Sequence, residues 1–250
     1  NTILCCFSMR PIPILTYHQI SQAPARGSPM RSLYVSPRDF AVQMHTLSLL
    51  GYQGLSMTAL MPYLKGEKTG KVVGITFDDG YVNNLENALS VLSKFNFSST
   101  CYVVSELLGT TNSWDHALGV APAPLMDITQ LRHWIDGGQE IGSHTQHHVD
   151  LTKTDTETSR SEIHNSRVSL SQRLGTNIQQ FCYPYGSYAP EHVDIVKASH
   201  YVAATTTERG KVHSQDNLFE LRRIPVVRST SLPQFLLKIL TSYEDRYRSA

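Results

Sequence analysis

The chain has 250 residues, enough for one large α/β domain or two small ones. Hydrophobic residues make up 40% and charged residues 17%, which is ordinary for a globular protein. A formal net charge of +1 gives no bulk attraction to nucleic acid or to an anionic membrane. No stretch approaches the roughly 20 apolar residues of a transmembrane helix. We therefore expect a neutral or small substrate.

The first ten residues do not share the pattern of the rest. An apolar run at residues 2–7 lacks the charged region and the cleavage site of an intact secretory signal. We expect residues 1–10 to be unstructured or non-native and residues 11–250 to form one domain. If Met9 is the natural start, the protein is cytoplasmic. If a longer leader was cut away, it is periplasmic or extracellular.

Apolar runs of strand length alternate with amphipathic helical patterns along the chain. The predicted strands cover residues 12–18, 52–55, 71–77, 99–104, 140–143, 178–183, 201–204 and 221–226. The predicted helices cover residues 37–50, 58–64, 85–95, 127–135, 155–174, 191–199 and 232–243. Such alternation favours parallel β/α units in a barrel or a wound sheet. In these folds the chemistry gathers at the carboxyl ends of the strands.

Two adjacent carboxylates end the strand predicted at residues 71–77. Asp78 and Asp79 are followed by Gly80, which lets the chain turn sharply. Each anion loses hydration and repels its neighbour at the end of a buried strand, and a bound cation would relieve that cost. An ordinary Asp-Gly turn has the same sequence, so this motif alone leaves both interpretations open.

Three histidines follow the strand predicted at residues 140–143. His144 and His148 are four residues apart and can face one point, while His147 is an alternative partner. Neutral imidazole is the commonest zinc ligand, and two histidines with one carboxylate leave positions open for water and substrate. The second carboxylate can then act as a base on that water. A single histidine is more often an ordinary surface residue, so the prediction depends on both clusters together.

Three motifs resemble those of the polysaccharide deacetylases, also known as carbohydrate esterase family 4 or NodB-homology domains. The sequence TFDDG at residues 76–80 is similar to the first motif, SHTQHH at residues 143–148 to the second, and FCYPYG at residues 181–186 to the third. Their order and spacing match, and the resemblance spans about residues 12–226. It implies a distorted (β/α) barrel of about seven strands in a single domain.

The resemblance also implies a role for each matched residue. Asp78 would be the general base. Asp79, His144 and His148 would hold a divalent metal ion, for which zinc is expected and cobalt or nickel are the alternatives. The backbone N–H of Tyr185 would help to form an oxyanion hole.

Two positions depart from the usual family pattern. The third motif ordinarily begins with an arginine where this chain has Cys182, and the usual C-terminal histidine motif is missing around residues 218–223. Both departures resemble the branch of poly-N-acetylglucosamine deacetylases, which implies His18 as the general acid. The alternative for His18 is a satisfied histidine at a strand end. Arg222 or Arg223 could supply the missing orienting charge, and an ordinary surface arginine is the alternative for each.

Other residues are candidates for contact with a sugar. The long connection at residues 107–125 holds Trp114 and Asp115, and an aromatic face can stack on a pyranose ring. Core packing is the alternative for the tryptophan. The remaining candidate substrate-binding residues are Tyr183, Arg222 and Arg223.

The sequence therefore predicts a metal-dependent hydrolase that removes N-acetyl groups from an amino-sugar polysaccharide, such as an exopolysaccharide, or from an oligosaccharide. One alternative is the same chemistry on an O-acetyl ester, a formamide or another non-peptide C–N bond. Another is a non-catalytic carbohydrate-binding relative, suggested by the missing arginine at Cys182. The expected partner is a carbohydrate, with no nucleic acid and no transmembrane segment, and the sequence indicates no oligomeric state.

Overall fold

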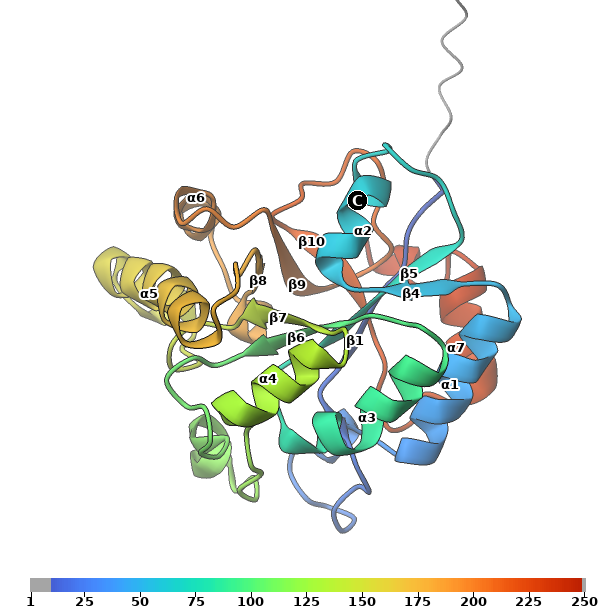
Figure 1. The fold of residues 1–250 in the computed structure, drawn as a ribbon, viewed down its shortest axis with the longest axis horizontal. Helices are drawn as coiled ribbons and strands as arrows, with labels where there is room; N and C mark the ends of the chain where they lie inside the picture. The colour runs from blue at the N-terminus through green and yellow to red at the C-terminus, as the bar shows by residue number, and fades with distance from the viewer. Residues whose placement is uncertain (1–9, 249–250) are drawn as a thin grey trace, which may run out of the picture.

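The computed structural model describes residues 10–248, and this part of the chain forms a barrel surrounded by helices (Figure 1). Parallel strands close into a seven-stranded ring, because β1 pairs with β10 on one side and with β5 on the other. In order around the ring, the strands are β1 (Ile14–Tyr17), β10 (Leu221–Pro225), β9 (Ala203–Arg209), β8 (Gln180–Cys182), β7 (Glu140–Ser143), β6 (Thr100–Val103) and β5 (Val72–Phe77). The predicted barrel of about seven strands in a single domain is confirmed. Residues 1–9 of the segment predicted to be unstructured lie outside the described residues.

One predicted strand lies outside the closed ring. β4 (Gln53–Leu55) pairs with the first half of β5, whereas β6 pairs with β5 at Thr76 and Phe77. Both strands use the edge of β5 opposite β1, so β4 branches from the ring. A small separate sheet, which the sequence did not predict, pairs β2 (Gln19–Ile20) with β3 (Tyr34–Val35).

The helices begin at side chains that accept hydrogen bonds from the first turn. Ser36 accepts from the backbone N–H of Asp39, and Asp127 forms a capping box with Gln130. The α-helices of the described residues are α1 (Pro37–Leu49), α2 (Met57–Leu64), α3 (Val82–Lys94), α4 (Ile128–Asp136), α5 (Thr156–Leu174), α6 (Pro190–Ala198) and α7 (Leu232–Leu240). The 3₁₀ helices are η1 (Arg31–Leu33), η2 (Ser113–Leu118), η3 (Leu151–Lys153), η4 (Pro184–Gly186) and η5 (Asp245–Tyr247). Among the described helices, none is long and apolar enough to cross a bilayer.

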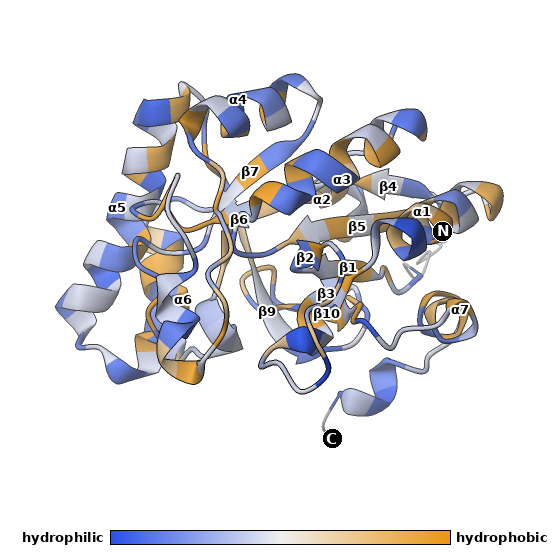
Figure 2. Ribbon diagram, turned by 90° about the horizontal axis from the view of Figure 1, so that it is seen from below, coloured by the Kyte–Doolittle hydropathy of each residue, from blue (hydrophilic) through white to orange (hydrophobic). Residues whose placement is uncertain are grey.

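Apolar side chains pack on both sides of the barrel wall. Outside it, Phe77 packs edge-on against Trp134 of α4, with ring centroids 5.7 Å apart. Inside it, Ile14 packs with Leu60 of α2. A Cβ at Gly74 would lie 2.9 Å from Leu60 Cδ2, so this glycine lets α2 approach β5 closely. Figure 2 shows apolar residues along β1 and β5, whereas the surrounding helices carry both polar and apolar residues.

A buried carboxylate ties the C-terminal segment to the barrel. Glu244 is fully buried and accepts hydrogen bonds from Arg209 of β9, at 2.9 and 3.0 Å, and from Nζ of Lys238 of α7, at 2.6 Å. Burial by itself would raise the pKa of Glu244, but its bonds to Arg209 and Lys238 outweigh burial and lower that pKa. The sequence predicted a helix to residue 243, but α7 ends at Leu240. The chain must turn back towards β9 for Glu244 to reach Arg209, which accounts for the earlier end.

We expect Glu244→Gln to lower the free energy of unfolding by about 3 kcal/mol at pH 7, because two cations lose their buried partner. A carboxylate whose pKa is depressed on folding stabilises the fold above its unfolded pKa, and that stability disappears as the pH falls through the folded value. Urea titrations should therefore show the two proteins converging below about pH 4.5. The matched control is Asp194→Asn on α6, whose side chain is 81% exposed. An equal loss in both variants would contradict the prediction.

Candidate active site

The candidate site lies where four strands of the barrel end. His18 follows β1, Asp78 and Asp79 follow β5, His144 follows β7, and Cys182 is the last residue of β8. The carboxyl ends of parallel strands share one rim of a barrel. Segments far apart in the sequence therefore meet here.

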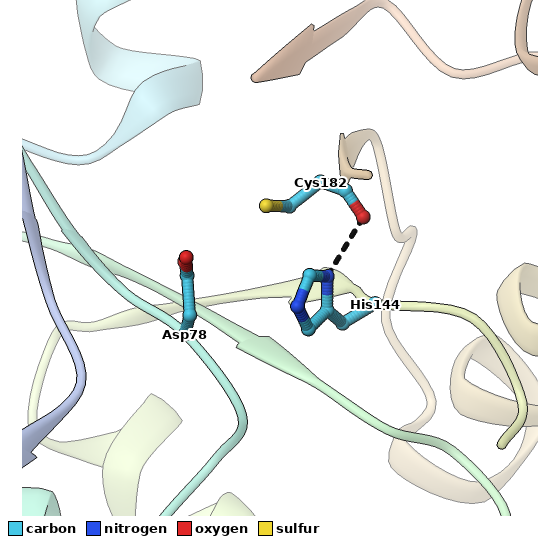
Figure 3. A group of neighbouring side chains, drawn as sticks. All are labelled: Asp78, His144 and Cys182. Carbon is cyan, nitrogen blue, oxygen red and sulfur yellow. Dashed lines mark hydrogen bonds between the residues drawn. The ribbon is translucent and has the colours of Figure 1, made fainter. Parts of the chain in front are cut away.

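Asp79, His144 and His148 form a buried cluster. Asp79 Oδ1 lies 3.6 Å from His144 Nε2 and 3.4 Å from His148 Nε2, and the three ligand atoms lie within 4.8 Å of one another. His144 Nδ1 donates to the backbone oxygen of Cys182 at 2.7 Å (Figure 3), which leaves the lone pair of Nε2 free to face Asp79. Two imidazole nitrogens and one carboxylate fit a divalent metal ion.

The electrostatics of the cluster also suit a cation. Burial by itself would raise the pKa of Asp79, but its contact with His148 and the nearby imidazoles outweigh burial and lower that pKa. Burial lowers the pKa of His148. Asp79 is therefore an anion and His148 a neutral imidazole at neutral pH, which are the forms that bind metals.

The backbone at these positions is unusual. Asp79, Thr145, His148 and Tyr185 have φ angles of 74°, 68°, 59° and 59°, in the left-handed region. The N–H of His148 donates to Thr145 Oγ1 at 3.0 Å, which holds this turn. Residues other than glycine adopt such angles at a cost of about 1–3 kcal/mol each, and they collect at functional sites.

His147 lies outside the cluster. Its Nδ1 is 2.7 Å from Glu162 Oε1, and its side chain is half-exposed. The other oxygen of Glu162 accepts the backbone N–H groups of Gln146 and His147, each at 2.9 Å. Glu162 therefore anchors the histidine loop from α5. The sequence did not reveal this role, because nothing distinguishes Glu162 within a long polar helix.

Asp78 is held by a buried arginine from β10. Arg223 is 1% exposed, and its Nη1 and Nη2 each donate to one oxygen of Asp78 at 2.7 Å. Arg223 also donates to Thr76 Oγ1 at 3.0 Å and to the backbone oxygen of Thr206 at 2.8 Å. Burial would raise the pKa of Asp78, but Arg223 outweighs burial and lowers it. Asp78 is therefore an oriented carboxylate.

Cys182 lies beside this pair in the position of the missing arginine. Its Sγ is 3.2 Å from Arg223 Nη2, and Figure 3 shows the sulfur pointing towards Asp78, with His144 to one side. Ligand atoms of Asp78, His144 and Cys182 also lie within 4.8 Å of one another. This second set suits a cation poorly, because the guanidinium contacts two of its members and burial raises the pKa of the Cys182 thiol. Arg223 thus supplies the positive charge from another strand.

The structure separates the two candidate arginines. Arg222 forms an ion pair with Glu208 at 2.8 Å and donates to the backbone oxygen of Arg209. Neighbouring residues of a strand point to opposite faces, so Arg222 points away from Asp78 while Arg223 points towards it. Tyr183 is fully buried, and its hydroxyl donates to the backbone oxygen of Phe219 at 3.1 Å. The substrate-binding roles of Arg222 and Tyr183 stay predictions, and in the structure both side chains are engaged with other protein groups.

His18 lies on the other side of Asp78. Its Nε2 is 3.9 Å from Asp78 Oδ2, and its side chain is 24% exposed. The backbone oxygen of His18 accepts from Asn84 Nδ2 at 2.9 Å, which fixes the end of β1. The imidazole is therefore beside the carboxylate and still accessible from solvent.

A groove opens next to the cluster of Asp79, His144 and His148. It has a volume of about 450 Å³ and is lined by Trp114, His147, His148, Val149, Asp150, Lys153, Thr154 and Tyr185. Asp115, beside Trp114 in η2, is buried, and burial together with the charge of Asp79 raises the pKa of its carboxyl group. The long connection at residues 107–125 thus places Trp114 in the groove and Asp115 near Asp79.

Comparisons with known proteins agree with this arrangement. A sequence model described as polysaccharide deacetylase matches residues 65–204, more than half of the chain. The protein named "Putative polysaccharide deacetylase YxkH" from Bacillus subtilis (strain 168) is 27% identical over 86% of this chain and 71% of its own length.

Solved structures share the fold. The Streptococcus pyogenes deacetylase PplD in complex with acetate has a TM-score of 0.81 and 26% identity, over 93% of this chain and 99% of that one. BC0361, a polysaccharide deacetylase from Bacillus cereus, has a TM-score of 0.77 and 27% identity, over 92% of this chain and 69% of that one. IcaB from Ammonifex degensii shares the fold, with a TM-score of 0.77 and 21% identity over 92% of this chain and 97% of that one. By sequence and by fold, this chain belongs to the polysaccharide deacetylase family, the NodB-homology domains of carbohydrate esterase family 4.

Proposed function

We propose that this polysaccharide deacetylase is a metal-dependent hydrolase that removes N-acetyl groups from an amino-sugar polysaccharide or oligosaccharide. The observation that carries the proposal is that the two adjacent carboxylates have different partners. Asp79 faces two histidines, whereas both oxygens of Asp78 are bound by Arg223. One acid can therefore hold a metal ion while the other acts as a base.

Asp79, His144 and His148 would hold the ion, with zinc the first choice and cobalt or nickel the alternatives. Held there, a divalent ion supplies Lewis-acid polarisation of an acyl carbonyl and lowers the pKa of water. Asp78 would take the proton of the attacking water, and Arg223 would keep its carboxylate ionised and oriented. This arrangement needs no arginine at Cys182, because Arg223 reaches the same carboxylate from β10.

The other two roles belong to His18 and Tyr185. His18 would donate a proton to the leaving amine, since an amine is a poor leaving group until it is protonated. The N–H of Tyr185 would stabilise the negative charge that develops on the acyl oxygen. Its left-handed backbone in η4, which follows β8, supports this role, because residues with strained backbone angles collect at functional sites.

The test is acetate release from a panel of N-acetylated and O-acetylated oligosaccharides. Metal-stripped protein is supplied in turn with zinc, cobalt or nickel. We expect release from N-acetylated amino sugars that depends on added metal. Release from the O-acetyl esters alone would replace the proposed substrate, and full activity without metal would overturn the proposed cofactor.

We further expect Lys153→Ala to raise KM for an N-acetylated oligosaccharide about fivefold with little change in kcat. Lys153 lines the groove, its side chain is 79% exposed, and it pairs with Asp150 at 2.9 Å. A hydrogen bond to a neighbouring sugar contributes about 1 kcal/mol, equally in the ground and transition states. The control is Lys197→Ala, which removes a lysine of a similar pair on α6. The prediction fails if both variants behave alike in steady-state kinetics.

A further inference from the structure

The two histidines of the metal cluster are supported differently. A metal-ligating histidine ordinarily donates its second ring nitrogen to a carbonyl, a carboxylate or water, and this bond orients the ring. His144 follows the rule through the backbone oxygen of Cys182. His148 Nδ1 is buried and has no hydrogen-bond partner among residues 10–248. No hydrogen bond from Nδ1 to a described protein group therefore fixes the rotation of the His148 ring.

Aromatic rings surround His148 instead. The Trp114 ring stacks on it with centroids 4.3 Å apart and an interplanar angle of 23°. The rings of Tyr185 and His144 meet it nearly edge-on, at 4.7 and 4.9 Å. Trp114 therefore contacts a full face of His148.

Trp114 is itself held in place by other residues. It packs against a small buried cluster formed by Tyr81, Ala123 and Leu125. The segment that carries it is tied back by Asn112, whose Oδ1 accepts from the N–H of Ala123 at 2.7 Å. Because His148 covers one face of Trp114, stacking on a pyranose ring would have to use the remaining surface of the indole.

We propose that Trp114 is a positioning residue for metal retention, which holds the His148 ring so that Nε2 faces Asp79. This inference depends on the metal site of the proposed function. The stacked indole orients His148, as the hydrogen bond to Cys182 orients His144. The long connection between β6 and α4, which carries Trp114, thereby becomes part of the metal site.

The test compares the zinc affinity of Trp114→Leu and Trp114→Phe, measured by competition with a chromophoric chelator. Leucine and phenylalanine are both smaller than tryptophan, but only the phenylalanine ring can still stack. We expect Trp114→Leu to lose about 10–100-fold in zinc affinity, as is typical when a group that supports a ligand is removed, and Trp114→Phe to keep most of it. The visible absorption of the Co²⁺ forms should change in Trp114→Leu and stay close to wild type in Trp114→Phe.

Leu118→Ala is the control, because Leu118 lies on the same 3₁₀ helix and is 58% exposed. The proposal is overturned if Trp114→Leu binds zinc like the wild type and raises only the KM for sugar, which would make Trp114 a substrate-stacking residue. Equal losses in the Leu and Phe variants, or in Leu118→Ala, would also overturn it. If the wild type binds no zinc, cobalt or nickel, the metal site of the proposed function fails first, so the two failures can be told apart.

Discussion

Asp78→Asn is expected to retain bound zinc while losing at least about 10²–10⁴-fold in deacetylase turnover. Asp79→Asn is expected to lose the zinc itself. The amide in Asp78→Asn keeps the size of the side chain but cannot accept the proton of the attacking water. Asp79 Oδ1, in contrast, is the carboxylate oxygen that faces both imidazoles. Replacing it removes the one anionic ligand of the cluster, and with it most of the affinity for the ion.

Metal content and acetate release should be measured on the same preparations. Asp78→Asn also breaks a buried ion pair with Arg223, which costs several kcal/mol in typical cases. Circular dichroism must therefore show that both variants are folded, and Asp194→Asn on α6 serves as the exposed control. Equal loss of zinc from Asp78→Asn and Asp79→Asn would mean that the two carboxylates are joint ligands, and the assignment of Asp78 as base would be wrong.

His18→Ala is expected to lower turnover of an N-acetyl amide by at least about 10²-fold while zinc remains bound. The imidazole lies beside Asp78 but outside the metal cluster, and its partial exposure leaves it open to a substrate. An activated ester should be affected far less, because its leaving group departs without a proton. The measurement compares kcat for the amide and for the ester in the wild type and the variant.

His164→Ala is a suitable control for this experiment, because His164 is exposed on α5 away from the barrel rim. Equal losses on amide and ester would show that His18 does not act as the acid. A loss of zinc from His18→Ala would place His18 in the metal site instead, which the distances in the cluster argue against.

The sequence by itself indicated parallel β/α units and the residues that end their strands, and the resemblance to known motifs implied that the strands close into a barrel. Alternating strand and helix patterns are local, and parallel strands must bring their carboxyl ends to one rim. The chain order of these patterns therefore suffices to place Asp78, Asp79, His144 and His148 near one another. The choice between His147 and His148 followed from the resemblance to known motifs, and the structure gives its geometric basis in the bond from His147 to Glu162.

The tertiary structure decided every contact that depends on how the ring closes. Arg223 lies 145 residues from Asp78, and only the closure of β1 against both β5 and β10 brings it beneath that carboxylate. The direction in which β10 faces selected Arg223 rather than Arg222. The position of Trp114 against His148 depends on a connection without a periodic pattern, so no local rule could predict it. Local sequence sets which residues end each strand, whereas packing over long chain separations sets which partners those residues meet.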